Sequence, residues 1–178
     1  QRERLERAWS ALPAGTKQVV TELIEKLRNG AEYLDLLGGP RGRPNFKTIG
    51  DAGVAKLAAV LPQCASLEAL WLRCVQMGEA GAWALAAALP QCASLQELNL
   101  SSNQIEDAGA QAVAAVLPQC ASLKYLSLCL NNITDACVAS SIIPALPLSS
   151  LTNLFLRDWN DETQKGSFTG AGRERLYK

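Results

Sequence analysis

The sequence predicts an α/β solenoid, in which a parallel β-sheet forms the concave face of a horseshoe arc and α-helices form its convex face. Two observations predict this fold. The heptapeptide Leu-Pro-Gln-Cys-Ala-Ser-Leu occurs three times, always 28 residues apart, at Leu61–Leu67, Leu89–Leu95 and Leu117–Leu123. Each copy is followed by leucines at the same spacing, and a fourth such set begins at Leu151. A fixed period of this size is typical of one supersecondary unit stacked on copies of itself.

Each repeat predicts a strand, a turn and a helix. Leu98 and Leu100 have the two-residue period of a strand whose leucines point inward. Asn103 follows where the chain turns, and its side chain is expected to satisfy backbone groups there. Asp107 is placed to cap an alanine-rich helix, which Pro118 ends. Such a unit cannot bury its apolar side alone, so the repeats are expected to share one continuous core.

The repeat pattern reads L-x-x-L-x-L-x-x-N-x-I-x-D-A-G, followed by a helix and L-P-x-C-x-S-L. It resembles the 28-residue leucine-rich repeat of the ribonuclease-inhibitor class, which occurs in sensor domains of nucleotide-binding immune receptors and in Ran GTPase-activating proteins. The resemblance covers residues 30–178. It implies the horseshoe fold and a binding role, but no particular partner, because proteins of this class bind many unrelated partners.

Several residues depart from the pattern. Val75 and Trp159 stand where the turn asparagine is expected, so those two turns are predicted to close differently. Cys137 replaces the glycine found early in the other helices. Pro144 and Pro147 predict that the helix of this repeat is short or broken.

The chain is predicted to divide into a helical N-terminal cap, residues 1–29, and about five strand–helix repeats, residues 30–178. The first strand is expected at Tyr33–Leu36. The leucine spacing is longer than the period allows at two places, which predicts insertions near residues 37–44 and 159–166.

The ends of the chain give two further expectations. Residues 168–172 repeat the pattern of a helix start, so the last sheet edge is expected either to continue into another repeat or to be covered. The chain begins with Gln1 rather than methionine, which predicts a processed or trimmed chain or a fragment of a longer protein. Membership of a larger complex is an alternative expectation.

Composition argues against several classes of function. Lysine plus arginine equal aspartate plus glutamate, 17 each, and the basic residues form no stripe, so a nucleic-acid partner is not expected. No apolar run reaches the length of a membrane span and no secretory signal is present. Because the chain has no histidine, Ser-His and Cys-His nucleophile pairs are impossible within it. A non-enzymatic protein without metal or cofactor is therefore expected.

Three of the six cysteines, Cys64, Cys92 and Cys120, occupy the same repeat position. Three equivalent residues cannot pair off, and no cysteine has the spacing of a metal site. They are expected to be small buried thiols in a reduced protein, which predicts a cytoplasmic location.

The candidate binding residues are the strand positions that point outward, because they change from repeat to repeat while the leucines do not. They are predicted to stack into three rows: Tyr33, Ala69, Glu97, Tyr125 and Asn153; Asp35, Trp71, Asn99, Ser127 and Phe155; Leu37, Arg73, Ser101, Cys129 and Arg157. The predicted partner-binding set comprises Tyr33, Asp35, Trp71, Arg73, Glu97, Asn99, Tyr125, Ser127, Asn153, Phe155 and Arg157. It is rich in aromatic residues and arginine, which dominate interface energetics.

Three functional hypotheses follow. The first is a non-catalytic protein-protein interaction module, a sensor, scaffold or assembly subunit that holds a protein or peptide on the concave face. The second, implied by the resemblance, is a Ran-type GTPase-activating protein in which Arg73 would serve a partner's active site; that class leads us to expect an acidic tail, whereas this chain ends Arg173–Lys178. The third is a structural subunit that docks through its outer helices and insertions. Scattered exposed aromatic residues are also ordinary on protein surfaces and need no partner to explain them.

Overall fold

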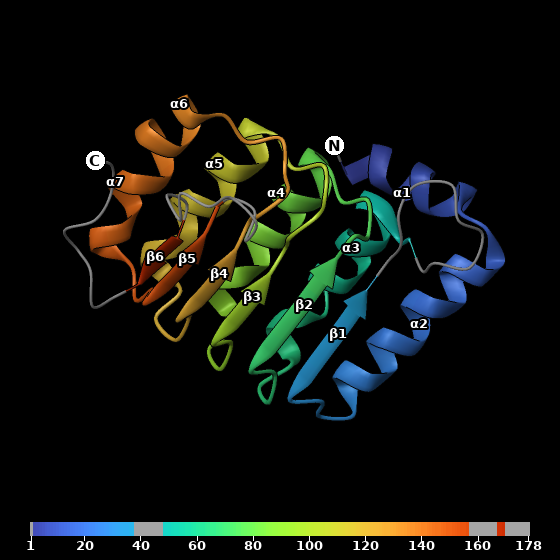
Figure 1. Ribbon diagram of the computed structural model, residues 1–178. Coiled ribbons are helices and arrows are strands. Elements are labelled where there is room, and N and C mark those ends of the chain that lie inside the picture. Colours follow the sequence, from blue (N-terminus) through green and yellow to red (C-terminus); the bar gives the residue numbers. More distant parts are fainter. Residues whose placement is uncertain (1, 38–47, 157–166, 170–178) are drawn as a thin grey trace.

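The computed structural model describes residues 2–37, 48–156 and 167–169. Within these residues six strands form one sheet in sequence order, so each strand pairs with the next along the chain (Figure 1). The strands are β1 (Tyr33–Leu37), β2 (Ala69–Arg73), β3 (Glu97–Asn99), β4 (Tyr125–Ser127), β5 (Asn153–Phe155) and β6 (Ser167–Thr169). The pairings from β1 to β5 are parallel. This confirms the predicted α/β solenoid.

The described α-helices are α1 (Arg2–Ala11), α2 (Ala14–Arg28), α3 (Gly50–Ala58), α4 (Glu79–Ala88), α5 (Asp107–Val116), α6 (Asp135–Cys137) and α7 (Ile143–Ala145). α3, α4 and α5 pack behind the sheet in Figure 1, whereas α1 and α2 lie beside its β1 end. Short 3₁₀ turns, η1 (Leu61–Gln63), η2 (Leu89–Gln91), η3 (Leu117–Gln119) and η5 (Leu146–Leu148), end the helical segments. None of the helices in the described part of the chain is both long and apolar enough to cross a membrane.

The repeated leucines form the core between the sheet and the helices. Leu70, Leu98 and Leu126 lie side by side in the pairing register and are completely buried. Burying one leucine side chain contributes roughly 1.5–3 kcal/mol. Because every repeat supplies the same leucines, the stack buries a continuous apolar layer that no single repeat could close.

Asn103 holds two neighbouring turns together, as its position in the repeat predicts. Its Oδ1 accepts hydrogen bonds from the backbone N–H groups of Val75 and Met77, at 3.0 and 3.1 Å. Its Nδ2 donates to the carbonyls of Leu72 and Leu100, at 2.7 and 3.0 Å. One buried side chain thus satisfies backbone groups of two repeats.

The turn around Val75 closes differently from the others, also as predicted. Val75 is completely buried, and the residues on either side of it, Cys74 and Gln76, adopt positive φ angles of 56° and 60°. In the next repeat the turn has one such residue, Ser102, and the asparagine follows it. Asn103 of the following repeat hydrogen-bonds backbone groups of this turn in the same way as Asn131 does for the turn one repeat later.

The expectation that Asp107 caps its own helix is wrong. Glu106 is the residue at the N-cap position of α5, and it makes no side-chain cap hydrogen bond. The Asp107 carboxylate instead reaches the next repeat, where it accepts hydrogen bonds from the backbone N–H and the hydroxyl of Thr134, both at 2.7 Å. Asp51, two repeats before Asp107, makes the same kind of contact: its carboxylate accepts hydrogen bonds from the backbone N–H groups of Gly78 and Gly81 in the next repeat. These aspartates link repeats because helix starts lie side by side.

The helical segment at residues 135–148 is continuous and changes helix type along its length, so the prediction from the two prolines that it is short or broken is wrong. It consists of α6, the π-helix η4 (Val138–Ile142), α7 and η5. Pro144 and Pro147 lie in the first turns of α7 and η5, where a missing N–H costs least.

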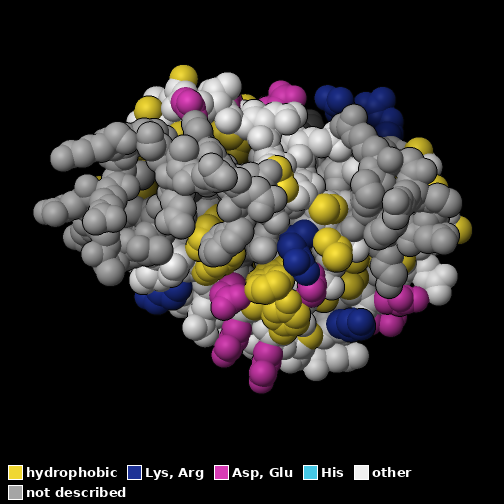
Figure 2. All heavy atoms as spheres, viewed as in Figure 1, with side chains coloured by type: hydrophobic (Ala, Val, Ile, Leu, Met, Phe, Trp, Pro, Cys, Tyr) yellow, Lys and Arg dark blue, Asp and Glu magenta, His cyan; other side chains and the backbone are white. Residues whose placement is uncertain are grey.

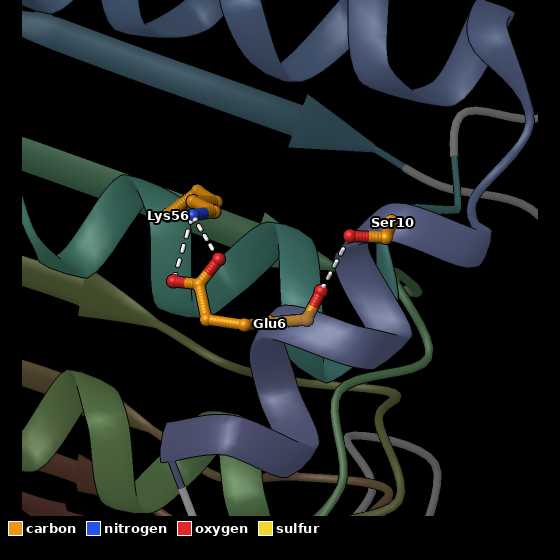
Figure 3. Close-up of polar contacts among 3 residues, drawn as sticks. All are labelled: Glu6, Ser10 and Lys56. Carbon is orange, nitrogen blue, oxygen red and sulfur yellow. Dashed lines mark hydrogen bonds and ion pairs between the residues drawn. The ribbon is translucent and has the colours of Figure 1, made fainter.

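The N-terminal helices differ in how they are held. α2 buries Val20, Leu23 and Leu27, whereas α1 has no buried residue. α1 contacts α3 through Lys56, whose Nζ donates to both carboxylate oxygens of Glu6 at 2.8 Å (Figure 3). The same Nζ lies 5.6 Å from the centre of the Trp9 ring. The role of residues 1–29 as a cap for the repeats stays a prediction.

The last described strand differs from the pattern that residues 168–172 predict. Ser167–Thr169 form β6, which pairs antiparallel with β5 in the register Asn153↔Thr169. The strand covers a sheet edge that would otherwise expose unpaired backbone groups. Both predicted insertions fall largely outside the described residues, as do Trp159 and Arg157.

The three equivalent cysteines are not equally buried. Cys64 and Cys120 are buried as expected, but Cys92 is only partly buried. Each Sγ donates to the carbonyl four residues before it, at 3.2 to 3.4 Å. Burial raises the pKa of the Cys92 and Cys120 thiols to about 11, so both are protonated at neutral pH.

Candidate functional site

Backbone pairing brings the outward-facing residues of β1 to β5 into the rows that the sequence predicts. Tyr33, Ala69, Glu97, Tyr125 and Asn153 are aligned in one row, and Asp35, Trp71, Asn99, Ser127 and Phe155 in the next. Leu37 and Arg73 are aligned beside the second row. We call the side chains of these twelve residues the concave face. Their assignment to a partner stays a prediction, and Arg157 lies outside the described residues.

A cluster around Trp71 forms the β1–β2 end of the concave face. The Tyr33 ring meets the Trp71 ring edge-on, with centroids 5.4 Å apart and planes at 70°. The Arg73 guanidinium carbon lies 5.0 Å from the Trp71 ring centre, and Arg73 Nη2 is 2.8 Å from Asp35 Oδ2. Edge-on aromatic pairs and a cation over an indole are both attractive, so the cluster is held in one arrangement.

Two hydrogen-bond donors in this cluster have no acceptor within the described residues. They are Nε1 of Trp71 and Nε of Arg73, and both atoms are buried. A buried donor without a partner costs roughly 1–3 kcal/mol. The β1–β2 end of the concave face therefore carries two donors that the described part of the chain leaves without an acceptor.

A second aromatic pair lies at the other end. The rings of Tyr125 on β4 and Phe155 on β5 have centroids 5.1 Å apart and planes at 37°. Both side chains are partly exposed. The concave face thus presents one aromatic pair on its first two strands and another on its last two parallel strands.

The side chains in the middle of the concave face are less exposed than the sequence predicts. Asn99 and Ser127 lie in their predicted row but are only 9% and 4% exposed, and Ala69 is buried as well. These side chains are short and stay close to the sheet, and Asn99 Oδ1 accepts a hydrogen bond from the Ser101 N–H at 3.0 Å. The accessible surface therefore consists mainly of the two aromatic pairs and the charged residues near them.

Glu97 is exposed and lies between the two pairs. It is aligned with Ala69 on one side and Tyr125 on the other. The pKa values of Tyr33 and Tyr125 are both raised, chiefly by burial, and the negative charge of Glu97 adds to the shift in each case. The charge of this one carboxylate thus raises the pKa of a tyrosine at each end of the concave face.

The comparisons with known proteins agree with the fold. A family model described as a leucine-rich repeat matches residues 91–114, which contain β3 and most of α5. The chain therefore contains a leucine-rich repeat and has the fold of a leucine-rich repeat protein. Its membership of the ribonuclease-inhibitor class stays a prediction. The sequence has no significant match among curated proteins.

Two solved structures similar to this leucine-rich repeat protein share its fold. Actin-binding site 2 of leiomodin-1 superposes with a TM-score of 0.64 at 17% sequence identity, covering 80% of each chain. The C-terminal domain of tropomodulin from Caenorhabditis elegans gives a TM-score of 0.64 at 14% identity, covering 81% of this chain and 85% of the other. At these identities the likeness shows the fold alone.

The leucine-rich repeat protein has a second exposed feature, on the convex side, which sequence reasoning did not single out. Trp83 of α4 is 47% exposed. It borders an open hollow of about 710 Å³ that Leu5 and Ala8 of α1 and Glu79 of α4 also line. A signal was present in the sequence, since a lone tryptophan interrupts the alanines of this helix.

Proposed function

We propose that this leucine-rich repeat protein is a non-catalytic protein-protein interaction module that holds a protein or peptide on its concave face. The observation that carries the proposal is the arrangement of Trp71, Tyr33, Arg73, Tyr125 and Phe155 as two organised aromatic groups on one sheet. Aromatic residues and arginine are the types most often found at energetic hot spots of interfaces. Aromatic rings already held by their neighbours lose little conformational entropy on binding.

The fold supports the same proposal. The solved neighbour from leiomodin-1 is an actin-binding site, so this fold carries a protein-binding role in at least that protein. At 17% identity the partner does not transfer with the fold. A sensor, scaffold or assembly subunit would each use the concave face in this way.

The contacts of Arg73 favour binding over a Ran-type GTPase-activating role. An arginine that serves a partner's active site has to extend toward the transferred phosphoryl group. Arg73 instead pairs with Asp35 and covers Trp71, with 28% of its side chain exposed. It is held as part of the surface.

We also propose that the protein works in a reducing compartment such as the cytoplasm. Cys64, Cys92 and Cys120 form no disulfide, although they lie at equivalent positions of successive repeats. Structural disulfides persist mainly in oxidising compartments.

The test compares the concave with the convex face by single substitutions of the same residue type. Tagged wild-type protein, Trp71→Ala and Trp83→Ala are used to capture partners from cell extract, and retained proteins are quantified by mass spectrometry. The proposal predicts that specific partners survive Trp83→Ala and are lost, at least about tenfold, in Trp71→Ala, because truncation of a hot-spot residue costs 2 kcal/mol or more. Melting temperatures of the three proteins show whether each variant is folded. Loss of partners in Trp83→Ala but not in Trp71→Ala would contradict the proposal and favour docking through the helices.

A further inference from the structure

In β1 to β5 and the residue before each of these strands, acidic residues outnumber basic ones. Glu32 and Glu68, the residues that precede β1 and β2, are exposed, and a backbone hydrogen bond of 2.7 Å between them places them on adjacent strands. Glu97 is exposed one strand further on. Figure 2 shows acidic side chains gathered beside the hydrophobic ones on this side of the protein.

The cations of the same strands leave most of these carboxylates unneutralised. Arg73 is already paired with Asp35. Lys124, which precedes β4, is exposed and lies beyond Gln96 in the row of residues that precede the strands. Within β1 to β5 and the residue before each, two cations therefore face four carboxylates. The chain as a whole has no net charge, so the excess is local.

From this combination we infer that the concave face binds a protein segment with a lysine or arginine flanked by apolar side chains. The inference rests on the proposed function and specifies the chemistry of the partner. The positive side chain meets Glu97, and the apolar side chains pack on the aromatic pairs Tyr33–Trp71 and Tyr125–Phe155. Aromatic faces attract cations as well as apolar groups, so the stem and the charge of a basic side chain are both favoured there.

The strand spacing sets the spacing of the apolar side chains. Trp71 on β2 and Phe155 on β5 lie in the same row, three strand steps apart, about 14 Å at roughly 4.8 Å per step. Side chains of an extended chain alternate between its two faces at about 3.3 Å per residue, so apolar residues four positions apart lie on one face at roughly this distance. The basic residue lies midway between them, on the same face.

The test uses three synthetic ten-residue peptide pools, each with two apolar residues four positions apart and all positions random except these two and the one midway between them. One pool has arginine between the apolar residues, one has glutamine and one has glutamate. Fluorescence anisotropy measures their binding to the wild-type protein in 50 mM and 500 mM salt. We expect the arginine pool to bind about tenfold more tightly than the glutamate pool in low salt, with the difference reduced in high salt.

Glu97→Gln tests the carboxylate, and Glu25→Gln, at an exposed position on α2, is its matched control. We expect Glu97→Gln to reduce the preference for arginine about threefold, and Glu25→Gln to leave it unchanged. Trp71→Ala should weaken the binding of every pool.

The outcomes separate the inference from the proposed function. Pools that bind equally well, with binding still lost in Trp71→Ala, would overturn the inference and leave the proposed function standing. Preference for the glutamate pool would overturn the inference in the same way. Absence of any binding that depends on Trp71 would overturn both.

Discussion

Asp107 of α5 is bound to Thr134 of the next repeat through both of its carboxylate oxygens, each at 2.7 Å. The backbone N–H and the hydroxyl of Thr134 lower the pKa of the Asp107 carboxyl below its usual value of 3.8. Thr134 in turn caps α6 by accepting from the Cys137 N–H at 3.2 Å. One carboxylate thus connects the start of one helix to the start of the following one.

This contact predicts a pH-dependent stability. A carboxyl whose pKa is lower in the folded state stabilises the fold above the pKa of the unfolded chain, and this stabilisation is lost as pH falls through the folded pKa. Asp107→Asn should therefore lower the melting temperature at pH 7, and the difference from wild type should shrink below about pH 4. Thermal denaturation across this pH range measures it. A difference that stays constant down to pH 3 would show that the charge of Asp107 contributes nothing.

Asn103→Ala should destabilise the protein strongly. The substitution leaves the N–H groups of Val75 and Met77 and the Leu72 carbonyl without their side-chain partner inside the fold. At roughly 1–3 kcal/mol for each unsatisfied buried group, a loss of at least about 2 kcal/mol in the free energy of unfolding is expected, measured by urea denaturation. Asn132→Ala, at an exposed position, is the control and should change stability by less than about 0.5 kcal/mol.

Gly81→Ala tests the close approach of α3 and α4. A Cβ at Gly81 would lie 2.7 Å from Asp51 Oδ1 and 2.8 Å from Met77 Cγ, so neighbouring atoms have to move. The free energy of unfolding should fall by about 1–3 kcal/mol. Gly15 of α2 is the matched control, since a Cβ there meets nothing within 4 Å and Gly15→Ala is expected to be neutral or slightly stabilising. Equal effects of the two substitutions would contradict this packing.

Leu98→Ala and Trp71→Ala separate the core from the concave face. Leu98 is completely buried, so its truncation should cost about 2–5 kcal/mol. Trp71 is partly exposed and its indole N–H has no acceptor in the described residues, so its truncation should cost less than about 1 kcal/mol. Chemical denaturation of both variants checks the order. A larger loss for Trp71→Ala would mean that this residue belongs to the core.

Sequence reasoning was most successful where one repeat copies another. The pairing of Trp71 with Asn99, and of Glu97 with Tyr125, follows from the constant leucine spacing, because parallel strands in identical units align at identical positions. The hydrogen bonds of Asn103 follow as well, since a turn between strand and helix leaves backbone groups that a polar side chain has to satisfy.

Prediction from the sequence failed where side chains of different repeats contact each other. The pattern assigned Asp107 to its own helix, whereas the carboxylate reaches Thr134, because a residue spacing does not show how closely two helix starts approach. The pattern also treated Asn99 and Ser127 as exposed, whereas both are buried, because a position in a row does not show how closely the surrounding atoms pack.

The sequence by itself thus determined the repeating unit, the order of the strands and the residues that share each row, because these depend on periodicity along one chain. The tertiary structure decided which side chains of a row remain accessible and how they pair. The contact of Arg73 with Asp35, 38 residues away, and the antiparallel pairing of β6 with β5 depend on distances in space. Packing sets those distances, and no period in the sequence records them.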